Sequence, residues 1–140
     1  MRTLLWMLVC CSFVPLSLSA EDNTRTALVR DFIAAYNAHD SAAMAALVTE
    51  DVQWLSIAGD KIAVETDGKA ALVAGMDSYF ESCPSCQSSL RSLMASRDRV
   101  SAIEVATWDG KNGPQEQSGM SVYEFSGSLI RRVYYFPAEK

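Results

Sequence analysis

Glu104 is the side chain of this sequence best suited to acid–base chemistry, and its surroundings have two interpretations. Residues 100–108 alternate with the period of a β-strand, so Ile103 and Val105 share one face while Glu104 shares the other with Trp108. If the more apolar face is buried, Glu104 lies in solvent. If Glu104 instead faces an apolar pocket, desolvation suits its carboxylate to proton transfer or to holding a cationic group. The sequence leaves both arrangements open.

Cys83 and Cys86 enclose a two-residue loop, Pro84-Ser85. A pair this close is expected to oxidise outside the reducing cytosol, and closing so short a loop stabilises a fold by about 2 kcal/mol in the loop-entropy model. A redox-active pair needs its first cysteine at the start of a helix that follows a strand. This pair follows an expected helix and precedes an expected strand, which favours a structural disulfide over redox catalysis or free thiols.

His39 is the only histidine, and it lies in the segment Asn37-Ala38-His39-Asp40, where we expect a turn between two helices. A solvated turn residue is the simpler interpretation, and a catalytic base is the alternative. No cluster of cysteine, aspartate or glutamate at metal-ligand spacing accompanies His39. We therefore expect neither a metal site nor a cofactor.

Residues 1–20 have the pattern of a cleaved secretory signal peptide. Arg2 provides the positive start, an apolar run covers Leu4 to Val14, and small residues precede Ala20. A bilayer-spanning helix needs about 20 apolar residues, so the run is short for a membrane anchor, which is the main alternative. We expect residues 21–140 to form one secreted or periplasmic domain, without membrane contact after cleavage.

The composition of the 140 residues is that of a globular protein, with 49% hydrophobic and 21% charged residues. The formal net charge is −5, and the longest basic run is the pair Arg131-Arg132. A protein that grips a phosphate backbone carries a basic patch, so we expect no nucleic-acid partner.

The elements that must position these side chains are three helices and six strands. Apolar residues recur at helical spacing in residues 24–38, 41–48 and 69–80, and Asp40 or Ser41 can cap the second helix. Strand-like alternation covers residues 52–57, 61–65, 88–96, 100–108, 115–125 and 129–136. This order predicts an α+β fold in which the helices pack on one face of a curved, mainly antiparallel six-stranded sheet. Such a sheet leaves a concave mouth that can hold a small molecule.

Several motifs, in their order and spacing, resemble the SnoaL-like branch of the nuclear transport factor two-like superfamily. They are Phe32-Ile33-Ala34-Ala35-Tyr36-Asn37-Ala38-His39-Asp40, Leu47-Val48-Thr49-Glu50-Asp51-Val52-Gln53-Trp54, Gly68 before a helix ending in Tyr79-Phe80, Val122-Tyr123-Glu124-Phe125 and Ile130-Arg131-Arg132-Val133-Tyr134-Tyr135. The resemblance covers residues 21–140 and implies a cystatin-like cone with a deep pocket, often assembled as a homodimer through the outer face of the sheet.

The superfamily that these motifs resemble includes polyketide cyclases, ketosteroid isomerases, dehydratases and non-catalytic binding modules. The resemblance therefore implies a fold but does not assign one function. In steroid isomerisation a carboxylate moves the proton, while a phenol and a protonated acid stabilise the oxyanion. By this resemblance, Ser56 stands at the position of the carboxylate, Phe32 at that of the phenol and Ser121 at that of the protonated acid. Because serine alone is too weak a base, we expect no isomerase activity of that type.

If a cavity forms, its expected lining is aromatic with a few hydrogen-bonding groups. The walls would be Trp54, Trp108, Tyr123, Tyr134 and Phe136, and the polar points Tyr36, Ser56, Gln117 and Ser121. Ordinary core packing is the alternative for each aromatic residue.

Arg132 alternates with Ile130, Tyr134 and Phe136 on the last expected strand, which predicts that Arg132 shares the cavity and pairs with Glu104. An anionic ligand would then be held by Arg132.

Three functional hypotheses follow. The first is an exported domain that binds a small, partly apolar organic molecule and uses Glu104 for lyase- or isomerase-type acid–base catalysis. The second is a non-catalytic ligand-binding or dimerisation module. The third is a disulfide oxidoreductase built on Cys83 and Cys86.

Overall fold

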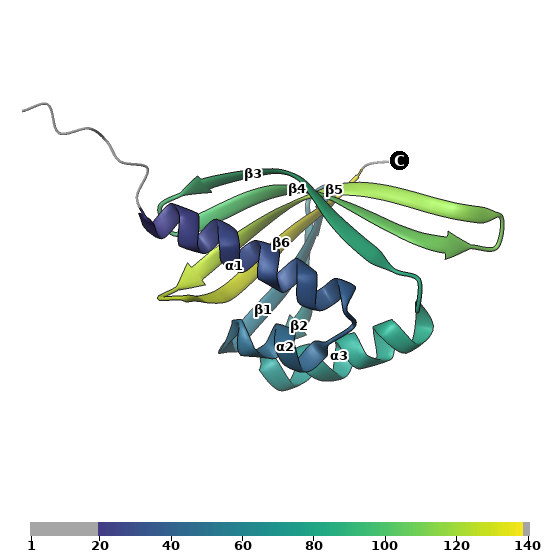
Figure 1. Ribbon diagram of the computed structural model, residues 1–140, viewed down its shortest axis with the longest axis horizontal. Helices are drawn as coiled ribbons and strands as arrows, with labels where there is room; N and C mark the ends of the chain where they lie inside the picture. Colours follow the sequence, from purple (N-terminus) through teal and green to yellow (C-terminus); the bar gives the residue numbers. More distant parts are fainter. Residues whose placement is uncertain (1–19, 139–140) are drawn as a thin grey trace, which may run out of the picture.

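Three helices cover one face of a curved, six-stranded sheet in the computed structural model, which describes residues 20–138 (Figure 1). The predicted signal peptide, residues 1–20, falls outside the described residues except for Ala20. The elements are α1 (Ala20–Asn37), α2 (Ser41–Ala46), β1 (Val48–Ala58), β2 (Lys61–Asp67), α3 (Lys69–Ser82), β3 (Gln87–Ser96), β4 (Arg99–Gly110), β5 (Gly113–Ser126) and β6 (Leu129–Pro137). The fold class predicted from the sequence is confirmed.

The start of each helix follows from its local sequence. Glu21 and Asp22 lie in the first turn of α1, where acidic side chains favour the positive end of the helix dipole. The side chain of Asp40 caps α2 by accepting a hydrogen bond from the amide of Ala43 at 2.8 Å. Gly68 precedes α3 with a φ of 92°, a backbone conformation that suits glycine.

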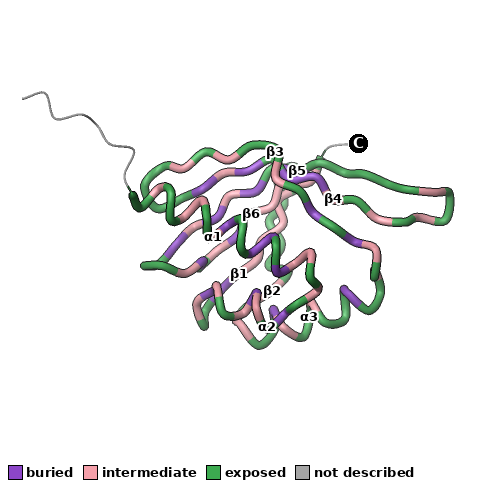
Figure 2. Tube along the Cα trace, in the orientation of Figure 1, coloured by how far each residue is buried: buried purple, intermediate pink, exposed green. Residues whose placement is uncertain are grey.

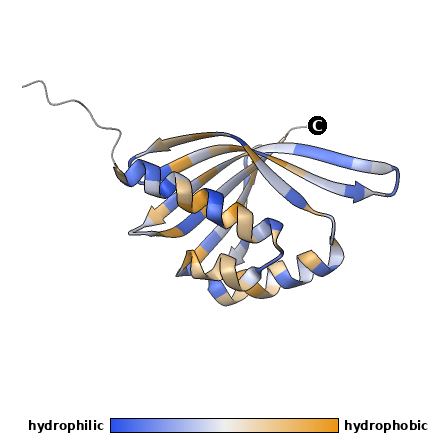
Figure 3. Cartoon of the chain, viewed as in Figure 1, coloured by the Kyte–Doolittle hydropathy of each residue, from blue (hydrophilic) through white to orange (hydrophobic). Residues whose placement is uncertain are grey.

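The strand order is β2-β1-β6-β5-β4-β3, and every neighbouring pair is antiparallel except β1 and β6. Helix α1 packs against β3 and β4, whereas α3 packs against α2, β1 and β2. The far ends of β4 and β5 extend beyond the helices as a long hairpin (Figure 1). No described helix covers the tip of this hairpin, so the tip is exposed, and its residues are hydrophilic (Figures 2 and 3).

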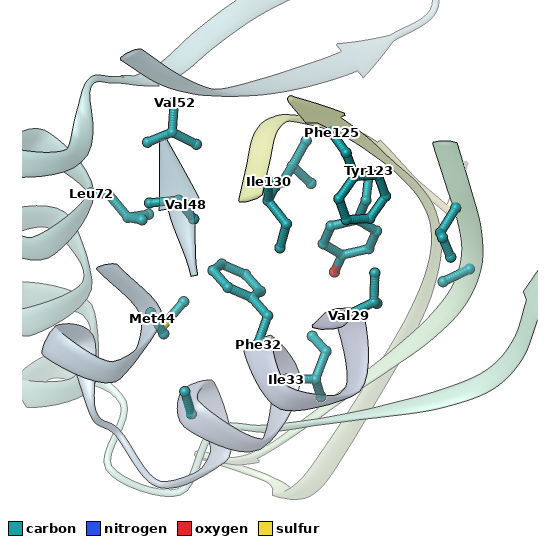
Figure 4. Close-up of a cluster of buried hydrophobic side chains, with 14 of the residues drawn as sticks. Val29, Phe32, Ile33, Met44, Val48, Val52, Leu72, Tyr123, Phe125 and Ile130 are labelled. Carbon is teal, nitrogen blue, oxygen red and sulfur yellow. The ribbon is translucent and has the colours of Figure 1, made fainter. Parts of the chain in front are cut away.

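The hydrophobic core lies between the sheet and the three helices. Phe32 of α1 points between β1 and Tyr123 of β5, and Met44 and Leu72 from the other two helices close the side next to Val48 (Figure 4). Phe32 and Tyr123 form an edge-to-face aromatic pair with ring centroids 6.2 Å apart. The core therefore joins all the helices to both halves of the sheet.

A β-bulge in β6 changes which side chains face the helices. Glu124 is paired with Arg132 and Phe125 with Ile130, so Arg131 is an extra residue without a partner on β5. The extra residue reverses the alternation that the sequence predicted for the rest of the strand.

Beyond the bulge, Val133 is buried on the helix side at 1% exposure, and Tyr135 lies on that same side. Arg132, Tyr134 and Phe136 therefore lie on the outer face of the sheet, opposite to the expected placement.

Candidate functional site

Glu104 of β4 lies on the helix-covered face of the sheet and is only 8% exposed. The structure thus resolves the two interpretations in favour of the pocket. Around Glu104 the strand is buried unevenly: Ala102 on the inner face is 3% exposed and Val105 on the outer face is 2% exposed, whereas Ile103 on the outer face is 39% exposed. Because the outer face of β4 carries the bulkier apolar side chains, Ile103 and Val105, alternation of apolar residues alone could not locate the carboxylate.

Two hydroxyl groups from β5 hold the Glu104 carboxylate. Ser121 donates a hydrogen bond to its Oε1, and Tyr123 donates a second to the same oxygen with an O–O distance of 2.5 Å. Both donors are inaccessible to solvent. No hydrogen bond or ion pair involves Oε2 in the part of the chain that the structure describes, so this oxygen is available to a molecule in the adjoining cavity.

The cavity in front of Glu104 has a volume of about 280 Å³ and is predominantly apolar. Strand β1 provides Trp54, β6 provides Tyr135, and the helices provide the opposite wall. Its lining consists of Phe32, Ile33, Tyr36, Trp54, Met76, Tyr79, Ser88, Glu104, Ala106 and Tyr135. Glu104 is the one charged residue in this lining, which contains no lysine, arginine or histidine.

The phenols around Glu104 are held in their protonated form. Burial is the main cause that raises the pKa of Tyr36, Tyr123 and Tyr135, and the negative charge of Glu104 raises all three further. At neutral pH these phenols therefore act as hydrogen-bonding groups and not as bases. Glu104 is the side chain of this lining that can accept a proton from a bound molecule.

Gly119 leaves the space that Tyr135 occupies. Gly119 is paired with Glu104 across β4 and β5, and a Cβ atom added to it would lie 2.7 Å from the hydroxyl oxygen of Tyr135. The absence of a side chain therefore lets the Tyr135 ring cross β5 toward the cavity.

The other predicted lining residues have different positions. Tyr36 and Trp54 line the cavity, while Tyr123 and Ser121 lie beneath it as partners of Glu104. Trp108 and Gln117 line an adjoining hollow of about 390 Å³ that shares Tyr79, Ala106 and Tyr135 with the cavity. Ser56 is half-buried and lines neither space.

The predicted pairing of Arg132 with Glu104 is wrong. Arg132 lies on the outer face, where Nη1 forms an ion pair with Glu124 at 3.3 Å and Nε donates a hydrogen bond to Gln53. Tyr134 is also on this outer face and accepts a hydrogen bond from Arg132. The bulge at Arg131 is the physical reason, because it turns these side chains away from the cavity.

The sequence did not assign Tyr79, Tyr135 and Ser88 to the cavity. The apolar periodicity of α3 contained the signal for Tyr79, but a helix face alone does not distinguish a cavity wall from core packing. No local pattern identified Tyr135, because the bulge interrupts the period. The alternation at the start of β3 did not indicate that Ser88 faces the cavity. The buried hydroxyl of Ser88 has no hydrogen-bond partner among the described residues.

Cys83 and Cys86 form a disulfide, as expected. Cys83 follows the last turn of α3, which is the opposite end of a helix from the one that activates a thiol. The hydroxyl of Tyr36 donates to Tyr79, and the hydroxyl of Tyr79 donates to Cys86 Sγ at 3.1 Å, so the disulfide loop supports one wall of the cavity.

His39 is part of the same wall. Its ring stacks on Phe80 with centroids 4.5 Å apart, and Nε2 lies 3.0 Å from the carbonyl oxygen of Cys86. These contacts indicate a packing role outside the cavity. Within residues 20–138 no group of three or more His, Cys, Asp or Glu side chains is arranged to hold a metal ion.

A larger hollow of about 550 Å³ lies along the start of α1 and the turn between β5 and β6. Its lining contains surface residues such as Glu21 and Thr24 and no buried titratable group. We therefore assign the candidate site to the cavity at Glu104.

None of the described helices is long and apolar enough to cross a membrane.

Comparison with known proteins agrees with this architecture. A family model described as a SnoaL-like domain matches residues 29–133. None of the curated proteins has significant similarity to the chain.

Three solved structures illustrate the shared fold. An uncharacterised cystatin-fold protein from Novosphingobium aromaticivorans is 24% identical, with a TM-score of 0.70 over 79% of this chain and 96% of that one. Bal32a, from a soil-derived mobile gene cassette, is 21% identical, with a TM-score of 0.73 over 85% and 92% of the two chains. A presumed ketosteroid isomerase from Kribbella flavida is 21% identical, with a TM-score of 0.69 over 86% and 82%. At these identities the similarity establishes the fold.

Proposed function

Because the chain belongs to the SnoaL-like domain family and holds a buried carboxylate in an apolar cavity, we propose that it binds a small, partly apolar organic molecule there and uses Glu104 for acid–base catalysis. The two carboxylate oxygens of Glu104 have different environments, and this difference supports the proposal. Oε1 is fixed by Ser121 and Tyr123, while Oε2 has no protein partner among the described residues. A fixed carboxylate with one free oxygen has the geometry of a general base.

The position of Glu104 distinguishes this site from the steroid-isomerase arrangement described above. The carboxylate comes from β4, and Ser121, which stands where the second acid would be, is its hydrogen-bond donor. Phe32, at the position of the phenol, forms part of the apolar wall. We therefore propose lyase- or isomerase-type proton transfer centred on Glu104, without the oxyanion-stabilising acid of the isomerases.

The experiment uses 5-nitrobenzisoxazole, a probe that reports a base in a water-poor cavity. When a base removes the C–H proton of its isoxazole ring, the N–O bond breaks and a coloured cyanonitrophenolate forms. We expect the wild-type protein to accelerate this ring opening beyond free acetate at the same pH. Glu104→Gln should lower kcat/KM by about 100-fold or more, the usual contribution of a positioned base.

Glu116→Gln is the matched control, because it removes the same charge from an exposed position on β5. It should leave the rate unchanged. Turnover by wild type no faster than acetate, or equal turnover by Glu104→Gln, would contradict the catalytic role. Binding of the probe without turnover would instead support a non-catalytic ligand-binding module.

We also propose that the protein forms a homodimer through the outer face of the sheet. Large apolar side chains are exposed on this face or its edges, among them Ile103 at 39%, Met120 at 41% and Met94 at 69%. Burying such side chains would stabilise a dimer. Light scattering coupled to size-exclusion chromatography should give twice the chain mass, and Ile103→Glu together with Met120→Glu should give a monomer. A monomeric wild type would contradict this proposal.

We further propose that residues 1–20 direct export and are removed. The apolar run after Arg2 supports this proposal, and the Cys83–Cys86 disulfide is stable in an oxidising compartment. N-terminal sequencing of the protein from its natural host should begin at Glu21. A chain that begins at Met1 and remains in the cytosol would contradict export.

A further inference from the structure

The charge balance of the cavity at Glu104 identifies the kind of molecule that it can hold. Glu104 is more than nine-tenths buried, and no cationic side chain shares the cavity lining. Buried charges in proteins are normally paired, because an isolated ion loses its hydration without compensation. Among the described residues two hydroxyl groups donate to Oε1 and no cationic side chain lines the cavity, so the bound molecule is left to supply the positive charge.

The arginine that could have neutralised Glu104 is directed elsewhere. Arg132 forms its ion pair with Glu124 on the opposite face of the sheet. Arg99 also pairs with Glu124, at 3.0 Å. An anionic ligand in the cavity would therefore meet Glu104 without a balancing cation. Repulsion between like charges in a water-poor site opposes such a complex.

The remaining lining suits an organic cation. Aromatic rings line the cavity from β1, β6 and two helices, and they include Trp54, Tyr36 and Tyr135. The faces of aromatic rings attract ammonium groups by about 0.5–2 kcal/mol each, most strongly where water is excluded. A carboxylate in a lining rich in aromatic rings offers an ammonium group both a counter-ion and a low-polarity wall.

We propose that the molecule bound at Glu104 is a small organic cation, a protonated or quaternary amine with an apolar body, whose ammonium group lies against Oε2 and the faces of Trp54, Tyr36 and Tyr135. This inference rests on the proposed function, because it assigns a substrate class to the same cavity. The volume of about 280 Å³ lies just below the usual range for binding pockets, roughly 300–1,000 Å³, and therefore limits the ligand to a small molecule.

The test compares three substituted phenols that differ in charge, of which the cation and the neutral compound have the same shape. The cation is 3-(trimethylammonio)phenol, the neutral isostere is 3-tert-butylphenol, and the anion is 3-hydroxybenzoate. Titration calorimetry on the wild-type protein should show that the ammonium compound binds at least about tenfold more tightly than the tert-butyl compound, while 3-hydroxybenzoate binds most weakly.

Glu104→Gln removes the charge and keeps an oxygen that can accept from Ser121 and Tyr123. This variant should lose the preference for the ammonium compound and keep its affinity for 3-tert-butylphenol. The control Glu116→Gln carries the same change in net charge outside the cavity and should retain the wild-type preference. The comparison within the wild-type protein stands even if the Glu104 variant does not fold.

The outcomes separate this inference from the proposed function. Equal or tighter binding of 3-tert-butylphenol to wild type overturns the cation assignment, and turnover of 5-nitrobenzisoxazole would then leave the acid–base role standing. Failure of all three compounds to bind also overturns the cation assignment. If 5-nitrobenzisoxazole is not turned over either, the proposed function falls with it.

Discussion

At the scale of single residues, the environment of Glu104 depends on hydrogen bonds donated from the next strand. Ser121 and Tyr123 are two residues apart on β5 and both lie on the inner face, which lets their hydroxyls reach the same carboxylate oxygen. Each bond is made to a buried acceptor, where an unsatisfied group is costly. The side chain of Glu104 is therefore fixed before any ligand binds.

Replacing Ser121 by alanine removes one of the two donors and should destabilise the protein. Hydrogen bonds to charged groups contribute about 1.5–3 kcal/mol, so we expect the free energy of unfolding to fall by about that amount. Urea denaturation measures the change. Ser118→Ala, at an exposed position of the same strand, should change stability by less than about 0.5 kcal/mol. Equal effects of the two substitutions would mean that the Ser121 bond does not stabilise the fold.

Tyr123 should make the protein less stable at alkaline pH. Burial, followed by the charge of Glu104, raises the pKa of Tyr123 well above its ordinary value, so the folded protein keeps the phenolic proton where the unfolded chain loses it. The stability from this group is complete below about pH 10 and is lost as the pH rises toward the folded-state pKa, by at most about 1.4 kcal/mol per pH unit.

Urea denaturation between about pH 9 and pH 11 measures this slope, because that interval spans the ordinary tyrosine pKa of about 10. Tyr123→Phe has no proton to lose at this position and should show a shallower decline than wild type. The variant is less stable at every pH because it lacks the bond to Glu104, so the slopes and not the absolute values are compared. Parallel slopes would refute the assignment of the proton to Tyr123.

At the scale of elements, the bulge in β6 and the glycine in β5 together place Tyr135 in the cavity. The bulge turns Tyr135 toward the helices, and Gly119 gives its ring room to lie across β5. The same bulge leaves Arg132 outside. One extra residue in one strand therefore decides both an aromatic wall and the absence of a cation.

Gly119→Ala should disturb this arrangement. The new Cβ would lie 2.7 Å from the Tyr135 hydroxyl and 2.9 Å from the backbone oxygen of Phe136, and overpacking of this kind costs about 1–3 kcal/mol. Thermal denaturation measures the loss. Gly75→Ala is the control, because a Cβ there meets no heavy atom within 4 Å and alanine is favoured in a helix. Gly75→Ala should be neutral or stabilising, and a neutral Gly119→Ala would contradict the close approach.

At the scale of the whole molecule, one core connects all the helices to the sheet. Phe32 contacts the β1 side through Trp54, with ring centroids 6.3 Å apart, and the β5 side through Tyr123. Leu72 and Met44 extend the same core beneath α3 and α2. Because no element has a separate core, we expect the described domain to unfold as one cooperative unit.

Phe32→Ala tests this expectation. Phe32 is 1% exposed, and truncating a buried phenylalanine costs about 3–5 kcal/mol. The transitions followed by far-ultraviolet circular dichroism and by tryptophan fluorescence should both move to lower urea concentration and should still coincide. Ala58→Gly, at an exposed strand end, is a control with a much smaller expected effect. Separate transitions in the variant would show that the helices and the sheet can unfold independently.

Local patterns in the sequence predicted the fold class, the order of the elements and most of their ends. Hydrophobic periodicity, the cap at Asp40 and the turn glycines are local signals, and the structure extends the expected strands by only a few residues at most ends. The disulfide was also predictable, since its two cysteines are three positions apart. Such features depend on neighbouring residues, whose types and spacing the sequence displays directly.

Which side chains meet at the site depends on contacts between segments that are far apart in the sequence. Glu104 was ambiguous because the opposite face of its strand carries the bulkier apolar side chains, Ile103 and Val105, and Arg132 was misplaced because the bulge at Arg131 reverses an alternation that is otherwise regular. Tyr135 became a cavity residue for the same reason. A period of two assigns residues to faces only while strand pairing is uninterrupted, and it does not tell which face the helices cover. The pairing and packing of segments distant in sequence decide both.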